Sequence, residues 1–170
     1  MKIETLDDLL YKELQELYDE EERLTQALPK MARNTGSARL REAFQQHLAQ
    51  TLEHVSRLEE CFRHLGKKRG RETASGMKGL IQEGEHAIGH IQMSPLRDAA
   101  LIGAAKRVEH YEMGAYTGTI SFARALGHEN IATLLEKTLE EERETDAKLT
   151  EIAESTVNQE ALQLGAHQRG

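Results

Sequence analysis

The sequence predicts an all-α fold, an up-down bundle of four long helices within one domain. Glu, Leu, Ala, Gln, Lys and Arg dominate the composition, Pro occurs only at Pro29 and Pro95, and Trp is absent, which favours helix over strand. Apolar residues recur every three or four positions through long segments, as on one face of a helix. The length of 170 residues suits a single continuous core.

The first half of the chain predicts two antiparallel helices. Thr5 and Asp8 form a capping-box pattern with Asp in place of Glu, so a first helix is expected over about residues 6–33, bent at Pro29. The segment Asn34–Ser37 ends this helix and caps a second one, whose apolar face continues to Gly66. Because only a few residues join these two long helices, they must pack side by side.

The second half predicts another such pair after a long connection. Residues 66–94 contain a shorter amphipathic segment, which we interpret as a short fifth helix lying across the bundle. Ser94 and Pro95 are typical of a helix start, and this third long helix runs to Gly127. A fourth follows at once, and its pattern fades after about Val157.

We therefore expect a bundle domain at residues 1–157 and a frayed tail at residues 158–170. One long crossover between two antiparallel pairs is the ferritin-like connection. The predicted fold is thus a ferritin-like up-down four-helix bundle whose crossover carries the short fifth helix. Bundles of this kind hold metal pairs among carboxylates, although topology alone assigns no chemistry.

Charge and composition exclude several classes of function. The formal net charge of -7 and the pI near 5.6 argue against nucleic-acid binding, which needs a basic face. No apolar stretch approaches the roughly 20 residues of a membrane span, and the acidic N-terminus is unlike a signal peptide. We expect a cytoplasmic protein with neither nucleic-acid nor membrane partners. Cys61 is the only cysteine, so any metal must take oxygen and imidazole ligands.

Acidic residues stand where amphipathic helices normally carry leucine. Glu21, Glu112 and Glu142 each lie at the centre of an apolar stripe on a different predicted helix, and Asp146 follows Glu142 by one turn. Basic residues are nearly absent from these stripes, so protonation or a bound multivalent cation must offset the buried charge. One such glutamate alone is more often half of a salt bridge, but three in register favour metal ligands.

The second helix offers a polar band in place of an acid. His47, Gln50, Thr51 and His54 follow one edge of its apolar face. We expect His54 and Gln50 to ligate, with His47 as a further candidate. The alternative for each histidine is a core side chain with its hydrogen bonds satisfied.

The spacing of these residues suggests two similar hairpins. Glu21 precedes Gln50 by 29 positions, and Glu112 precedes Glu142 by 30. Glu109 lies one turn before Glu112 and is expected as an additional ligand. A pseudo-twofold pair of metal ions follows from this arrangement.

Two other motifs are interpreted as surface features. Glu83 and His86 make the only Glu-x-x-His spacing, but they lie on the polar face of the short helix. The basic run Lys67–Arg71 predicts a solvated loop, with docking to an acidic partner as the alternative.

Several segments closely resemble the YciF family of ferritin-like proteins, which is also known as a domain of unknown function. The likeness spans about residues 5–155, and the motifs that carry it are Val108–Tyr116, Thr138–Leu149, Asp98–Ala105 and Gly79–Gly84. The resemblance implies a dimeric, rubrerythrin-like four-helix bundle with a di-iron-type centre, associated with stress responses.

Position by position, the resemblance supports ligands on all four long helices. They are Glu21, the band from His47 to His54, Glu109, Glu112, Glu142 and Asp146. This chain departs from the family at Gln50, where relatives often have an acidic residue at or beside that position, and the Glu-x-x-His motif of di-iron helices is absent from the second and fourth helices.

We therefore predict a stress-associated protein whose core binds two metal ions, with iron expected and manganese or zinc as alternatives. The expected ligands are Glu21, Gln50, His54, Glu109, Glu112, Glu142 and Asp146. The expected chemistry is oxidation of iron(II) or reduction of peroxide by a homodimer, with oxygen or peroxide as co-reactant. The alternatives are a non-catalytic metal-binding or structural stress protein, and a metal-free helical adaptor.

Overall fold

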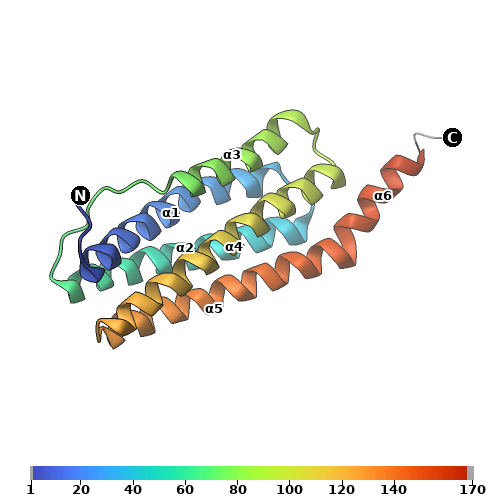
Figure 1. Cartoon of the computed structure of the whole chain (residues 1–170). Coiled ribbons are helices and arrows are strands. Elements are labelled where there is room, and N and C mark those ends of the chain that lie inside the picture. The colour runs from blue at the N-terminus through green and yellow to red at the C-terminus, as the bar shows by residue number, and fades with distance from the viewer. Residues whose placement is uncertain (1, 168–170) are drawn as a thin grey trace.

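The computed structural model describes residues 2–167, which form helices joined by short loops and include no strand (Figure 1). This confirms the all-α bundle. The helices are α1 (Leu6–Asn34), α2 (Ala38–Leu65), α3 (Ser75–His90), α4 (Pro95–Ala125), α5 (Glu129–Ile152) and α6 (Asn158–His167), with one stretch of π-helix, Ala153–Val157, between α5 and α6.

The helices begin and end where local chemistry requires. At the start of α1, Thr5 Oγ1 accepts a hydrogen bond from the Asp8 backbone N at 3.1 Å, and Asp8 Oδ2 accepts one from the Thr5 backbone N at 3.1 Å. Ser37 caps α2 by accepting from the Leu40 backbone N. Gly66 ends α2 with a φ of 64°, which favours glycine.

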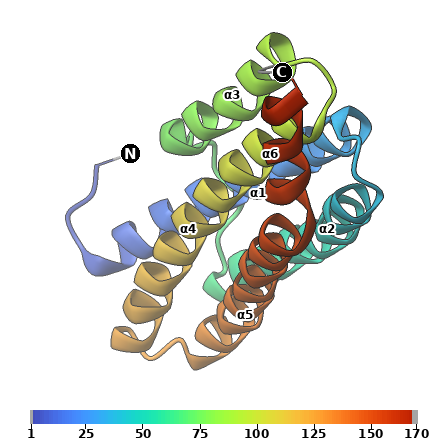
Figure 2. The same ribbon diagram turned by 90° about the vertical axis from the view of Figure 1, so that its right-hand side faces the viewer.

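The four long helices pack in a ring, with α1 beside α2 and α4, and α5 beside α2 and α4 (Figure 2). Helix α3 covers α1 and α4. The connection from α2 to α4 returns along the bundle, so that α4 begins beside the turn between α1 and α2. Asp98 of α4 accepts hydrogen bonds there from Thr35 Oγ1 at 2.6 Å, from Gly36 N at 3.1 Å and from Ser37 N at 3.0 Å.

The apolar core is divided into two clusters, one toward each end of the bundle. One cluster includes Leu28, Phe44, Leu101 and Leu149, and the other includes Leu10, Leu14, Leu58, Ile120 and Leu135. On each long helix, the change from one cluster to the other falls at buried acidic or histidine residues. A polar layer therefore crosses the middle of the bundle.

The C-terminal segment differs from the prediction of a frayed tail, because residues 158–167 form α6. Val157 is buried in the core and α6 contacts α4, and these contacts position a segment that has little apolar periodicity of its own. Residues 168–170 of the expected tail lie outside the described part of the chain. No helix within residues 2–167 has the combined length and apolarity to cross a membrane.

Candidate metal centre

The polar layer consists of six buried side chains from all four long helices. Helix α2 contributes His47 and His54, which are seven residues apart and so share one face. The exposed fraction of every member is 3% or less, and the layer comprises Glu21, His47, His54, Glu109, Glu112 and Glu142.

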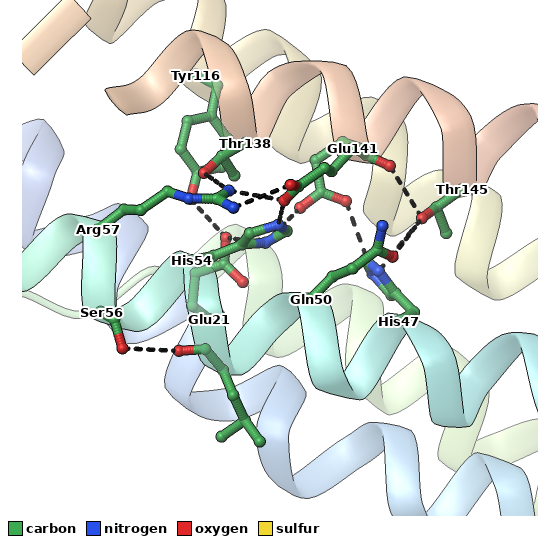
Figure 3. A network of polar contacts seen from close by, with 12 residues as sticks. Glu21, His47, Gln50, His54, Ser56, Arg57, Tyr116, Thr138, Glu141 and Thr145 are labelled. Carbon is green, nitrogen blue, oxygen red and sulfur yellow. Dashed lines mark hydrogen bonds and ion pairs between the residues drawn. The ribbon is translucent and has the colours of Figure 1, made fainter. Parts of the chain in front are cut away.

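One half of the layer is centred on His54. Its Nδ1 lies 3.2 Å from Glu21 Oε1 and 3.0 Å from Glu142 Oε1. Its Nε2 lies 2.8 Å from Glu141 Oε2, and Arg57 Nη2 donates to Glu141 Oε1 at 2.9 Å (Figure 3). With Nε2–H donated to Glu141, loss of the other ring proton leaves the Nδ1 lone pair directed at the interior carboxylates, which is the orientation a ligating imidazole needs.

The other half is centred on His47. Its Nε2 lies 3.3 Å from Glu109 Oε1 and 3.6 Å from Glu142 Oε2, while its Nδ1 contacts Thr145 Oγ1 at 3.3 Å. Glu112 completes this group. The potential ligand atoms of His47, Glu109, Glu112 and Glu142 lie within 4.8 Å of one another, as do those of Glu21, His54 and Glu142.

Glu142 therefore belongs to both groups, with one oxygen facing each histidine. A carboxylate placed in this way can bridge two metal ions. The two groups share no other side chain.

The layer contains many buried atoms that complete no hydrogen bond within residues 2–167. They are Glu21 Oε2, His47 Nε2, His54 Nδ1, Glu109 Oε2 and both carboxylate oxygens of Glu112 and Glu142. Orphaned buried acceptors are costly, and here they face common centres, so these residues fit bound cations well.

Burial also shapes the protonation of the layer. It raises the pKa of Glu142 and of Glu109 to about 8, and that of Glu112 well above its usual range, with neighbouring glutamates adding to the effect at Glu142 and Glu112. Burial alone would lower the pKa of His54, but the charges of Glu21 and Glu142 raise it to about 10. Protons would therefore compete with any metal ion for this layer.

Residues 5–162 match the family described as Domain of unknown function (DUF892). This chain belongs to the DUF892 family. Protein YciF of Escherichia coli strain K12 is 40% identical over 164 residues, which cover 95% of this chain and 98% of that protein. The family resemblance predicted from the sequence motifs is thereby confirmed.

Three solved structures are similar to this fold. The crystal structure of the E. coli stress protein YciF gives a TM-score of 0.88 at 39% identity, covering 92% of this chain and 99% of that one. YcfI from Rhodopseudomonas palustris gives 0.85 at 35% identity, covering 88% and 95%. A Xanthomonas campestris protein with 21% identity and a TM-score of 0.73, covering 96% and 99%, supports the fold alone.

In this DUF892 chain, five of the seven residues expected to ligate meet in the polar layer, namely Glu21, His54, Glu109, Glu112 and Glu142. Gln50 is only half-buried. It lies about 60° around α2 from His47, and it contacts Thr145 Oγ1 at 3.5 Å and lines a pocket between α2 and α5. His47, the further candidate on α2, is buried in the layer.

Asp146 also lies outside the two groups. It is rotated by about 40° from Glu142 around α5, and its side chain is 22% exposed. It pairs with Lys106 and lies 3.1 Å from His110 Nε2. Lys106 lies on the flank of α4, so the apolar stripe of α4 alone does not predict this ion pair.

The two hairpins are less alike than their spacing suggested. Both histidines of the layer belong to α2. At the position that corresponds to Glu109, the first hairpin has Tyr18, whose hydroxyl donates to Glu59 at 3.3 Å, away from the layer. Glu83 and His86 are exposed, as predicted, and Glu83 pairs with Arg107.

Three further residues support the layer, and two of them, Glu141 and Glu20, have no signal in the sequence. Tyr116 is fully buried and donates its hydroxyl to Glu21 Oε1. Glu141 belongs to a run of acidic residues, from which the sequence alone does not distinguish it. Glu20 is 2% exposed and next to Glu21, so its burial depends on the neighbouring helices.

Proposed function

We propose that this DUF892 protein binds two metal ions, iron in the first instance, in the polar layer and that Glu142 bridges them. The observation that carries the proposal is the division of the Glu142 oxygens between His54 and His47 at 3.0 and 3.6 Å. One ion would be held by Glu21, His54 and Glu142, and the other by His47, Glu109, Glu112 and Glu142.

Charge supports two divalent ions. The two groups contain four glutamates in all, and no lysine or arginine among the described residues forms an ion pair with any of them. Two divalent cations neutralise four carboxylates. Carboxylate and imidazole donors without thiolate suit iron, with manganese and zinc as alternatives.

We further propose that the centre oxidises iron(II) or reduces peroxide. Iron(II) held there would supply the two electrons that, with two protons, reduce hydrogen peroxide to two molecules of water. The protein contributes positioning: Glu141 and Arg57 orient His54, and the Tyr116 hydroxyl holds Glu21. The apolar clusters on both sides exclude bulk water from the layer.

Aerobic addition of iron(II) to metal-free protein tests this activity. We expect a coloured ferric species that saturates at two iron ions per chain, and steady consumption of peroxide when a reductant is supplied. Protein loaded with redox-inactive zinc is the matched control. Iron that binds in this stoichiometry but neither oxidises faster than in buffer nor consumes peroxide would exclude catalysis.

A second candidate function is a non-catalytic metal-binding or structural stress protein. The favouring observation is that Glu142 is the only carboxylate common to both groups, while Gln50 contacts Thr145. A single bridging carboxylate suits metal ions that close the bundle. In that case, metal would raise the melting temperature without any turnover.

The cellular setting is proposed from the relatives. The E. coli relative is described as a stress protein, and we propose a stress-associated, cytoplasmic role and a homodimer for this chain. Multi-angle light scattering of the purified full chain would give the mass of the assembly, with twice 19.2 kDa expected.

A further inference from the structure

The metal centre is enclosed, so an ion needs a route to reach it. The exposed fraction of Glu21, Glu112 and Glu142 is 0%. Glu20, the neighbour of Glu21 on α1, is itself only 2% exposed, and its Oε2 has no hydrogen-bond partner within residues 2–167. Because successive helical residues differ by about 100°, Glu20 faces a different side of α1 from Glu21 and belongs to neither ligand group.

Glu20 is the inner end of an acidic stripe on α1. Glu13, Glu16 and Glu20 are spaced by three and four residues, so they lie on one face of the helix. The side chains of Glu13 and Glu16 are about equally exposed, at 24% and 25%, whereas Glu20 is only 2% exposed. The stripe therefore joins two partly exposed acids to one deeply buried acid.

The stripe runs from the bundle surface to the metal centre. Tyr111 of α4 is 39% exposed, and after burial the charges of Glu20, Glu16 and Glu13 are the largest influences that raise the pKa of its hydroxyl. At the inner end, Glu20 directly precedes the ligand residue Glu21 on α1.

A cation already occupies the outer end of the stripe. Lys12 is paired with Glu16 and lies 3.2 Å from Glu13 Oε1. No basic residue in the described part of the chain forms an ion pair with Glu20. The one deeply buried acid of the stripe is therefore the one without a counter-ion.

We infer that Glu13, Glu16 and Glu20 form the uptake route for divalent cations, with Glu20 as the last transient site before the ligands Glu21 and Glu112. This inference rests on the proposed function. Carboxylates along a low-dielectric passage concentrate cations and accelerate their arrival. Lys12 holds the two outer carboxylates until an incoming ion displaces it.

Stopped-flow loading of the metal-free full chain with Co²⁺ tests the inference, since cobalt absorption in the visible range reports occupancy without catalysis. We expect Glu20→Gln to slow loading by about tenfold while two ions still bind at equilibrium. Glu22→Gln is the matched control, because this substitution removes the same charge from the same helix. Glu22 is 47% exposed and paired with Arg69. The control variant should load at the wild-type rate.

Lys12→Met is a second variant, and it changes a residue that is not deeply buried. We expect this variant to take up Co²⁺ faster than the wild type. Equal loading rates for Glu20→Gln and Glu22→Gln would overturn the inference. A fall to one bound ion in Glu20→Gln would also overturn it, because Glu20 would then be a permanent ligand. Wild-type protein that takes up no cobalt, manganese or iron would overturn the proposed function itself.

Discussion

At the scale of single residues, the proposed metal centre depends on Glu142, because each of its oxygens faces a different histidine. We expect Glu142→Ala to lose both ions, whereas Glu21→Ala should lose only the ion beside His54. Elemental analysis of the purified variants after metal loading measures this difference. Loss of one ion in both variants would show that Glu142 does not bridge.

Glu141 acts through His54. It accepts from His54 Nε2 at 2.8 Å and is held by Arg57, and removal of such a partner typically weakens metal affinity by about 10–100-fold. We expect Glu141→Gln to weaken one ion and leave the other unchanged in a calorimetric titration. Glu140→Gln, on an exposed side chain paired with Arg143, should alter neither.

The buried acids give the metal-free protein an unusual pH dependence. Burial raises the pKa of Glu109 and Glu142 from an ordinary value of 4.5 to about 8, and the neighbouring glutamates raise that of His54 from 6.5 to about 10. In all three the folded state binds protons more tightly than the unfolded state, so the free energy of unfolding falls as pH rises from about 5 to about 9.

Calorimetry of chelator-treated protein across this pH range measures the effect. We expect the melting temperature to fall with rising pH, and the slope to flatten in Glu142→Gln, which cannot ionise there. A melting temperature that rises steadily through this window would contradict the burial of ionisable carboxyls in the layer.

The sequence predicts those parts of the site that depend on one helix alone. Glu21, Glu112 and Glu142 were identifiable because the centre of an apolar stripe is a property of one helix. Gln50 and Asp146 are only partly buried, because a rotation of about 40–60° moves a side chain between core and flank. The partner that receives it, such as Lys106 for Asp146, belongs to another helix.

At the scale of helices, the predicted boundaries agree closely with the structure, because caps and terminators act within a few residues. The expected first helix over 6–33 corresponds to Leu6–Asn34, and the predicted ends at Gly66 and Gly127 fall just after α2 and α4. Helix α6 was not predicted, since it depends on contacts with α4 that no local pattern records.

Asp98 joins separate helices, and its loss should be costly. It is 2% exposed and accepts three hydrogen bonds from the α1–α2 turn, so we expect Asp98→Ala to lower the free energy of unfolding by about 3 kcal/mol. Glu53→Ala, at an exposed position of α2, should change it by no more than about 0.5 kcal/mol. Urea denaturation compares the two, and equal effects would contradict this role.

At the scale of the whole molecule, a charged layer divides one core into two apolar clusters. Two antiparallel pairs and a long crossover were predictable from loop lengths, because short loops force neighbouring helices together. The alignment of the polar residues from four helices into one layer was only partly predictable, since it depends on how far each helix slides along its neighbours.

Metal should stabilise this arrangement as a whole. A ligand that binds only the folded state at about 100 times its Kd adds about 2.7 kcal/mol, so chelation should lower the melting temperature. Loading with manganese or zinc should restore it, and an unchanged melting temperature after complete metal removal would favour a metal-free adaptor.

The most direct measurement is diffraction from metal-loaded crystals with anomalous data collected at the iron edge. We predict two peaks about 3.5–4 Å apart in the middle of the bundle, with one beside His54, the other beside His47 and the Glu142 carboxylate between them. A polar layer with no peak, or with its glutamates turned to basic side chains, would contradict the assignment.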